Sequence, residues 1–349
     1  MTACPLAYRL GAHKLRNAPA LRCETLYVIG GLYGNLQALE SIQSRARQEA
    51  DTPTLVFNGD FNFFNAEKQW WRALNETIRS SPLHVAMAGN VEIESSDPHS
   101  VGCGCGYPAY VPSRVIQRSD RIVGALRSIA IHSGESELLS WLRSLPKALV
   151  AEFGPERRRV GIVHGDVDSL SGWSLGVECM SPADKDLRSK LGCDSASGDA
   201  HLPLTPPSTI LEWCEDAQVT ALLSTHTCLP FGQFVDGTSG HERERRAVFN
   251  NGSAGMPNFK GTRYGLITRV STHLAVPEDT LYGGVADGLR YDAIPIHYDH
   301  EAWLLQFTSR WPDGSDAHAS YYSRLLDGPD SFSLKQAARD HTILYQHRI

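Results

Sequence analysis

This chain contains a series of short apolar segments, each of which stops at a glycine or a histidine next to polar residues. These segments constrain its fold more than any other feature. Strands are expected at residues 25–29, 54–57, 85–88, 160–163, 219–223, 247–249 and 264–270. Amphipathic helical patterns lie between them at residues 67–78, 114–129, 136–145 and 208–216. This alternation of strand, tight turn and helix predicts an α/β fold.

Four of the expected strands end at side chains that bind metal ions in proteins. These side chains are one carboxylate, one amide and two imidazoles, at Asp60, Asn90, His164 and His226. Because α/β sheets gather ligands beyond the carboxyl ends of their strands, we expect the four to converge. Any one of them alone is better interpreted as an ordinary hydrogen-bonded strand end. The four together predict a site for a divalent metal ion.

The order of these residues resembles the motifs of the calcineurin-like metallophosphoesterases. That family carries D-x-H, G-D, G-N-H, a single His and G-H-x-H in this order. The corresponding positions here are Gly31-Leu32-Tyr33, Gly59-Asp60, Gly89-Asn90-Val91, His164 and Thr225-His226-Thr227-Cys228. Flanking segments are also similar, at Gly34-Asn35-Leu36 and Asn250-Asn251-Gly252-Ser253. The resemblance implies an α/β sandwich of two packed β-sheets flanked by helices, a divalent metal ion and a phosphoester substrate.

The departures from the family pattern fall on one of its two metal sites. Three ligand positions of the first site are Gly31, Tyr33 and Cys228 here. The second site keeps all its ligands, which implies one metal ion (Mn, Fe or Zn). The alternative is a second ion in a remodelled form of the altered site, with Tyr33 and Cys228 as extra ligands helped by Cys103 or Cys105. If they are not ligands, Tyr33 and Cys228 fill the space that the metal has left.

A valine stands where the family has the histidine of G-N-H. Val91 can neither donate a proton nor carry charge, so it gives no general-acid help to a leaving group. The resemblance therefore implies a hydrolase for a phosphodiester, an anhydride or an activated monoester, with Asp60, Asn90 and His164 as catalytic residues. The alternative is a catalytically impaired protein of this fold that binds a metal, a phosphate or a partner.

Two further residues are candidates for the site. Asp166 follows His164 by two positions; it either orients a ligand imidazole as part of the catalytic set or caps the following turn. Arg263 is a candidate for binding the anionic substrate, and an ordinary surface residue is the alternative.

The rest of the chain suggests one elaborated domain. We expect residues 1–24 to form an N-terminal arm, and residues 25–271 to form the metallophosphoesterase-like domain with insertions near 93–135 and 169–207. Residues 272–349 are expected as a helical extension packed on that domain.

The net charge of the chain is -6 and the sequence has no long basic block, so there is no nucleic-acid signature. No segment approaches transmembrane length, and the cytoplasm is the expected location.

Overall fold

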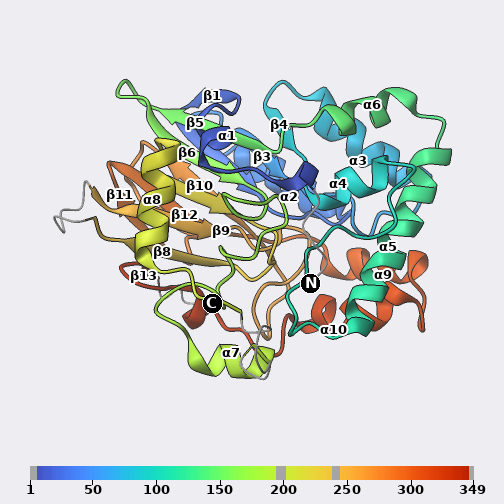
Figure 1. Cartoon of the computed structure of the whole chain (residues 1–349). Helices are drawn as coiled ribbons and strands as arrows, with labels where there is room; N and C mark the ends of the chain where they lie inside the picture. The colour runs from blue at the N-terminus through green and yellow to red at the C-terminus, as the bar shows by residue number, and fades with distance from the viewer. Residues whose placement is uncertain (1–5, 194–201, 238–243, 346–349) are drawn as a thin grey trace.

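Two β-sheets pack face to face and carry helices on their outer sides (Figure 1). The computed structural model describes residues 6–193, 202–237 and 244–345. The α/β sandwich expected from the sequence is confirmed by this arrangement. Within the described residues, no helix is both long and apolar enough to cross a membrane.

The larger sheet joins a parallel half to an antiparallel half. Its seven strands lie in the order β13 (Ile343–Leu344), β11 (Tyr282–Ala286), β12 (Leu289–Ile296), β10 (Gly265–Ser271), β2 (Thr25–Ile29), β3 (Thr54–Asn58) and β4 (His84–Met87). β2, β3 and β4 are parallel, whereas β10 runs antiparallel to both β2 and β12.

The second sheet contains six strands and is also mixed. Its order is β1 (Ala20–Cys23), β5 (Ala148–Phe153), β6 (Arg158–Val163), β7 (Ala221–Ser224), β9 (Arg246–Asn250) and β8 (Phe231–Val235). The central strands β6, β7 and β9 are parallel. The carboxyl ends of β6 and β7 therefore lie together, as do those of β3 and β4 in the other sheet.

Alternation along β2 shows how the two hydrophobic cores are built. Leu26 and Val28 belong to the core between the sheets, whereas Tyr27 and Ile29 belong to the core between the larger sheet and its helices. All four side chains are fully buried. Because successive side chains of a strand point to opposite faces, one apolar strand serves both cores. Burial of each such aliphatic side chain contributes roughly 1.5–3 kcal/mol.

Helices cover both outer faces. They are η1 (Leu6–Tyr8), α1 (Ala12–Arg16), α2 (Leu36–Ala46), α3 (Lys68–Ser80), α4 (Asn90–Ser96), α5 (Ser113–His132), α6 (Ser136–Ser144), α7 (Lys185–Leu191), α8 (Pro207–Ala217), α9 (His300–Arg310), α10 (Asp316–Asp327) and α11 (Leu334–Ala337). α1 packs against α8 on the smaller sheet, and α5 packs against α4 and α10 beside the larger one. Figure 1 shows the C-terminal helices α9 and α10 next to α5.

Both ends of the chain contribute more structure than the sequence suggested. Within the expected arm of residues 1–24, β1 pairs with β5, and Tyr8 and Leu15 are buried. The expected helical extension also contains β11, β12 and β13. β12 lacks a plain apolar pattern because Arg290 and Asp292 form a buried ion pair within it, at 2.7 Å.

Candidate metal centre

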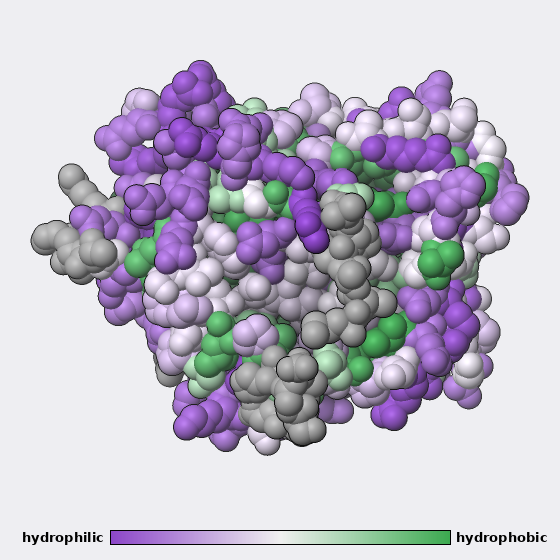
Figure 2. Space-filling model, viewed as in Figure 1, coloured by the Kyte–Doolittle hydropathy of each residue, from purple (hydrophilic) through white to green (hydrophobic). Residues whose placement is uncertain are grey.

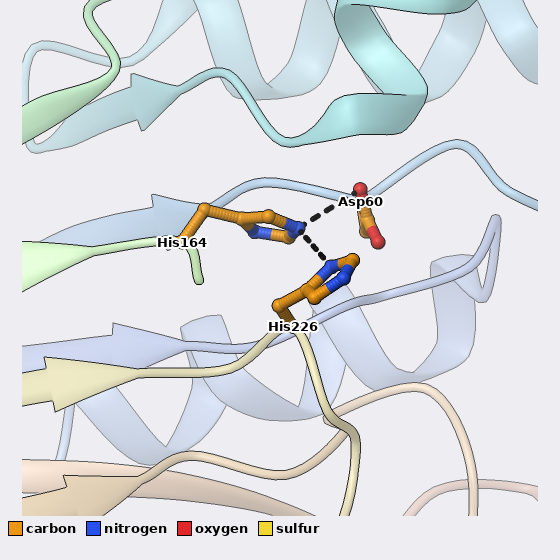
Figure 3. Close-up of side chains that lie close together, drawn as sticks. All are labelled: Asp60, His164 and His226. Carbon is orange, nitrogen blue, oxygen red and sulfur yellow. Dashed lines mark hydrogen bonds and ion pairs between the residues drawn. The ribbon is translucent and has the colours of Figure 1, made fainter. Parts of the chain in front are cut away.

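Side chains from the strand ends of both sheets meet at one point (Figure 3). Asp60 follows β3 and His164 follows β6; Nε2 of His164 lies 3.4 Å from Oδ1 of Asp60. His226 follows β7, and its Nδ1 lies 3.2 Å from the same His164 Nε2. One ligand atom from each of these three residues lies within 4.8 Å of the other two. The convergence expected from the strand ends is therefore present.

Backbone carbonyl groups fix which ring nitrogen of each histidine faces the centre. Nδ1 of His164 lies 2.7 Å from the carbonyl oxygen of Asn58, and Nε2 of His226 lies 2.8 Å from that of Cys105. A carbonyl only accepts hydrogen bonds, so these two nitrogens carry the ring protons in the neutral imidazoles. The lone pairs of His164 Nε2 and His226 Nδ1 then face each other, which is the orientation that metal ligands need.

Asn90 completes the set and is held in the same way. Its Nδ2 donates to the carbonyl of Cys103 at 2.8 Å, so its Oδ1 points to His164 Nε2 at 3.2 Å. When His164 is neutral, two oxygens and two unprotonated nitrogens thus meet without a donor hydrogen between them. A bound cation satisfies such a group of acceptors, and so does a proton on His164: burial lowers the pKa of His164, but the charge of Asp60 and its hydrogen bond outweigh burial and raise it. The side chains present therefore fit a divalent metal ion, with ligand types suited to Mn, Fe or Zn.

The charges of the centre also suit a metal ion. Burial, together with the charge of His164, lowers the pKa of His226 to about 4. Burial raises the pKa of Asp60, but the charge of His164 and its hydrogen bond outweigh burial and leave the pKa below its ordinary value. At neutral pH His226 is uncharged and Asp60 is ionised, which are the forms that bind metals.

Glu92 supports the centre and was not predicted. Its Oε2 accepts hydrogen bonds from the backbone N–H of Asp60 at 2.7 Å and of Gly89 at 3.1 Å. The side chain is fully buried, and burial, followed by the charge of Asp60, raises its pKa to about 7. A Cβ atom at Gly89 would lie 2.3 Å from Asp60 Oδ1, so only glycine permits this approach. No sequence motif marked the glutamate.

Tyr33 and Cys228 lie against each other beside the centre. Tyr33 Oη and Cys228 Sγ share a hydrogen bond of 2.8 Å. Burial raises the pKa of both groups above their ordinary values, so both are protonated in this arrangement. A Cβ atom at Gly31 would lie 2.3 Å from Cζ of Tyr33. The phenol ring therefore fills the space that a side chain at residue 31 would need.

The loop that carries Cys103 and Cys105 orients the ligands through its backbone. The carbonyl oxygen of Cys105 accepts from His226 and also from Nε1 of Trp173, the latter at 3.1 Å. The indole ring of Trp173 packs edge-on against His226, with centroids 5.6 Å apart. Asn90 donates to Cys103, as described above. A contact of this kind leaves no residue signature, because any side chain offers the same carbonyl.

The two further candidates differ in their placement. Asp166 accepts backbone hydrogen bonds from Asp168, Ser169 and Ser174, at 3.0, 2.8 and 3.1 Å, so it caps the turn after His164. Arg263 is exposed and is not among the side chains that line the cavity described next.

A cavity of about 350 Å³ opens beside the centre and is largely apolar. Asp60, Asn90, Val91 and His226 line one side of it. The other lining residues include Tyr33, Phe63, Cys105, Tyr107, Tyr110, Trp173, Glu178, Cys228, Tyr321 and Arg324. Figure 2 shows a face of the molecule that is hydrophilic at its rim, with hydrophobic residues visible in its middle part. Among the described residues that line this cavity, Arg324 from α10 is the one arginine, and no sequence motif marked it.

Comparison with known proteins finds structures with a similar fold at low sequence identity. No family model matches the chain, and no curated protein matches it. The solved structure of a hypothetical protein, PH1004 from Pyrococcus horikoshii OT3, is 16% identical, with a TM-score of 0.50 over 85% of this chain and 97% of that one. A metallophosphoesterase from Sphaerobacter thermophilus is 16% identical, with a TM-score of 0.48 over 88% and 99%. The similarity to PH1004 concerns the fold alone.

Proposed function

We propose that this protein is a phosphoester hydrolase that works with one divalent metal ion, Mn, Fe or Zn. Asp60, Asn90, His164 and His226 would hold the ion. The observation that carries the proposal is that four possible metal-ligand atoms converge at the wall of a cavity. When bound, such an ion supplies a Lewis acid for a phosphoryl oxygen.

A single ion is favoured by the side chains that occupy the neighbouring space. The ring of Tyr33 lies where a side chain at Gly31 would stand, and its hydroxyl is hydrogen-bonded to Cys228. Burial raises the pKa of both groups, so each would have to lose a proton against that shift to become a metal ligand. These features support Tyr33 and Cys228 as space-filling residues.

The wall of the cavity supports a substrate with a good leaving group. Val91 is buried and lines the cavity at the start of α4. Among the described residues that line the cavity, His226 is the one histidine, and its ring proton is bound to the Cys105 carbonyl. Without an imidazole to protonate the departing oxygen, a phosphodiester, an anhydride or an activated monoester suits this site better than an alkyl monoester.

The remaining residues of the site position its ligands and keep water away. Glu92 and the turn at Gly89 hold Asp60, and the Cys105 carbonyl holds His226. Asp166 supports the site indirectly. It accepts a hydrogen bond from the backbone N–H of Ser174, and the indole of the neighbouring Trp173 contacts His226. The aromatic residues around the cavity lower the local dielectric constant, which strengthens every charge interaction with a bound phosphate.

Val91 also favours a second candidate function. A site with these ligands but no imidazole at position 91 also suits a protein that binds a metal and a phosphate group without turnover. In that case Asp60 and His226 serve recognition alone.

Turnover of bis(p-nitrophenyl) phosphate in the presence of added Mn separates the two functions. A hydrolase cleaves this diester faster than an alkyl monoester, and substitution His226→Gln abolishes the activity. Metal binding with no cleavage of either ester would support the binding protein and contradict the hydrolase. His273→Gln is a matched control, because His273 is a half-exposed histidine paired with Asp51.

A further inference from the structure

We propose that Arg324 forms an anion site on the cavity wall and binds a phosphoryl oxygen of the substrate. The inference rests on the proposed function and extends it by naming a group that holds the substrate. Arg324 lies on the side of the cavity where Tyr33 and Cys228 replace metal ligands of the family pattern. A fixed guanidinium there supplies positive charge to that side.

Two backbone carbonyl groups hold the guanidinium in place. Nη2 of Arg324 donates to the carbonyl of Cys228 at 2.8 Å, and Nε donates to that of Pro257 at 3.4 Å. Nη1 has no hydrogen bond to any described residue that would use up its two N–H groups. The side chain is therefore fixed at one edge while part of its fork remains available to a ligand.

Among the described residues, the half-buried Arg324 lacks a carboxylate partner, whereas two more deeply buried arginines each have one. Arg269 pairs with Glu49 at 2.8 Å, and Arg290 pairs with Asp292 at 2.7 Å. Within residues 6–193, 202–237 and 244–345, no carboxylate oxygen comes within 4 Å of the Arg324 guanidinium nitrogens. A partly buried cation without a counter-ion carries a desolvation cost that a bound anion offsets.

Neither of the two carboxylates that line the cavity, Asp60 and Glu178, pairs with Arg324, although Oε2 of Glu178 has no hydrogen-bond partner among the described residues. Asp60 faces His164 at 3.4 Å, and Glu178 accepts a hydrogen bond from the hydroxyl of Tyr110 at 3.0 Å. Tyr321 and Tyr107, which also line the cavity, are neutral phenols whose pKa is raised by burial. Arg324 thus presents positive charge to an apolar cavity, where a phosphate group is the matching ligand for its planar fork.

Binding of inorganic phosphate by the full-length protein tests the anion site directly. Isothermal titration with the wild type, Arg324→Ala and Arg324→Lys is compared with Arg121→Ala. Arg121 is a suitable control because it contacts the same helix α10, through Asp316 at 2.6 Å, but lies on the surface. We expect Arg324→Ala to weaken phosphate binding by about tenfold or more, since hydrogen bonds to charged groups are the stronger ones. Arg324→Lys should bind with intermediate affinity, because it keeps the charge and loses the fork, and Arg121→Ala should bind as the wild type does.

A purely structural role of Arg324 predicts a different pattern. In that case Arg324→Ala lowers the urea midpoint while phosphate affinity, measured where the variant is folded, stays that of the wild type. If the alanine variant does not fold, Arg324→Lys decides, because an unchanged phosphate affinity in that variant overturns the proposal.

The two proposals fail in different ways. If the wild type hydrolyses the diester with Mn but Arg324→Ala binds phosphate normally, the anion site is wrong and the hydrolase stands. If the wild type shows no turnover but its phosphate binding depends on Arg324, the hydrolase is wrong and the anion site stands. A wild type that binds no phosphate also overturns the anion site.

Discussion

The phenol ring of Tyr33 occupies the space directly over Gly31. A Cβ atom added at Gly31 would lie 2.3 Å from Cζ and 2.7 Å from Oη of Tyr33. Tyr33 is 3% exposed and also packs against Phe63 and Phe64, so its ring has little room to move. The glycine and the tyrosine are therefore coupled: a side chain cannot return to residue 31 while the ring remains.

This coupling predicts that Gly31→Ala destabilises the protein. Overpacking of a filled core typically costs about 1–3 kcal/mol. In a Tyr33→Ala background the cost should shrink, because the ring is absent. Urea unfolding of the wild type, the two single variants and the double variant measures how much the cost of Gly31→Ala changes between the two backgrounds. Gly124→Ala is the control: its Cβ would meet nothing within 4 Å in the middle of α5, and it should stabilise by about 0.5–1 kcal/mol. Equal costs of Gly31→Ala in both backgrounds would contradict the coupling.

The valine at position 91 leads us to expect that the rate of hydrolysis depends strongly on the leaving group. Without a proton donor, hydrolysis of a series of aryl phosphodiesters should slow steeply as the pKa of the leaving phenol rises. Val91→His places an imidazole at the cavity wall and should accelerate the poorest substrates most, by about a hundredfold at best. Val91→Leu keeps the apolar wall and should keep the steep dependence. The same slope in the histidine and leucine variants would show that the leaving group needs no help from this position.

Asp166 should matter for stability more than for metal binding. It accepts three backbone hydrogen bonds in the turn after His164. Asp166→Ala leaves these donors without their partner, at a cost of about 1–3 kcal/mol, while the metal content stays that of the wild type. Asp166→Asn keeps one acceptor oxygen, so its free energy of unfolding should lie between those of the wild type and Asp166→Ala. Loss of metal at unchanged urea midpoint would instead assign Asp166 to the ligand set.

Glu49 gives the fold a defined dependence on pH. Its Oε1 accepts from Tyr27 Oη at 2.6 Å and from Arg269 Nε at 2.8 Å. Burial raises the pKa of Glu49, but the hydrogen bonds of Arg269 and Tyr27 prevail and lower it below the ordinary value. The contribution of a carboxyl group with a lowered folded-state pKa is present above its ordinary pKa and lost as pH falls.

The free energy of unfolding of the wild type should therefore approach that of Glu49→Gln as pH falls from about 5 to 3. Urea unfolding at each pH measures the gap between the two proteins. Glu137→Gln, at an exposed glutamate paired with Arg79, should show almost no gap at any pH. A gap that widens toward low pH would mean that Glu49 is not the stabilising partner.

The sequence predicted the convergence of these four side chains because each of them follows a strand. Asp60, Asn90, His164 and His226 each stand after an apolar run, and the sheet order brings those run ends together. The period of the helices was also informative: α5 and α8 lie within a few residues of their expected ranges. Local pattern therefore accounts for most of the elements that position the four ligands.

Other parts of the site and fold could not be read in this way. Arg324 reaches the cavity only because α10 packs on α5, and nothing near it in the sequence marks that contact. Cys105 acts through its carbonyl oxygen, which every residue has. β12 was missed because its charged residues, Arg290 and Asp292, are buried as a pair and break the apolar pattern. Tertiary packing decides all three, and a single sequence does not display it.

Metal content per chain, measured by elemental analysis of purified protein loaded with Mn and then desalted, tests the central claim most directly. We predict one ion per chain, lost in His164→Gln and retained in Cys228→Ala. A wild type that binds no ion, or two ions of which one is lost in Cys228→Ala, would contradict a single site held by the strand-end residues.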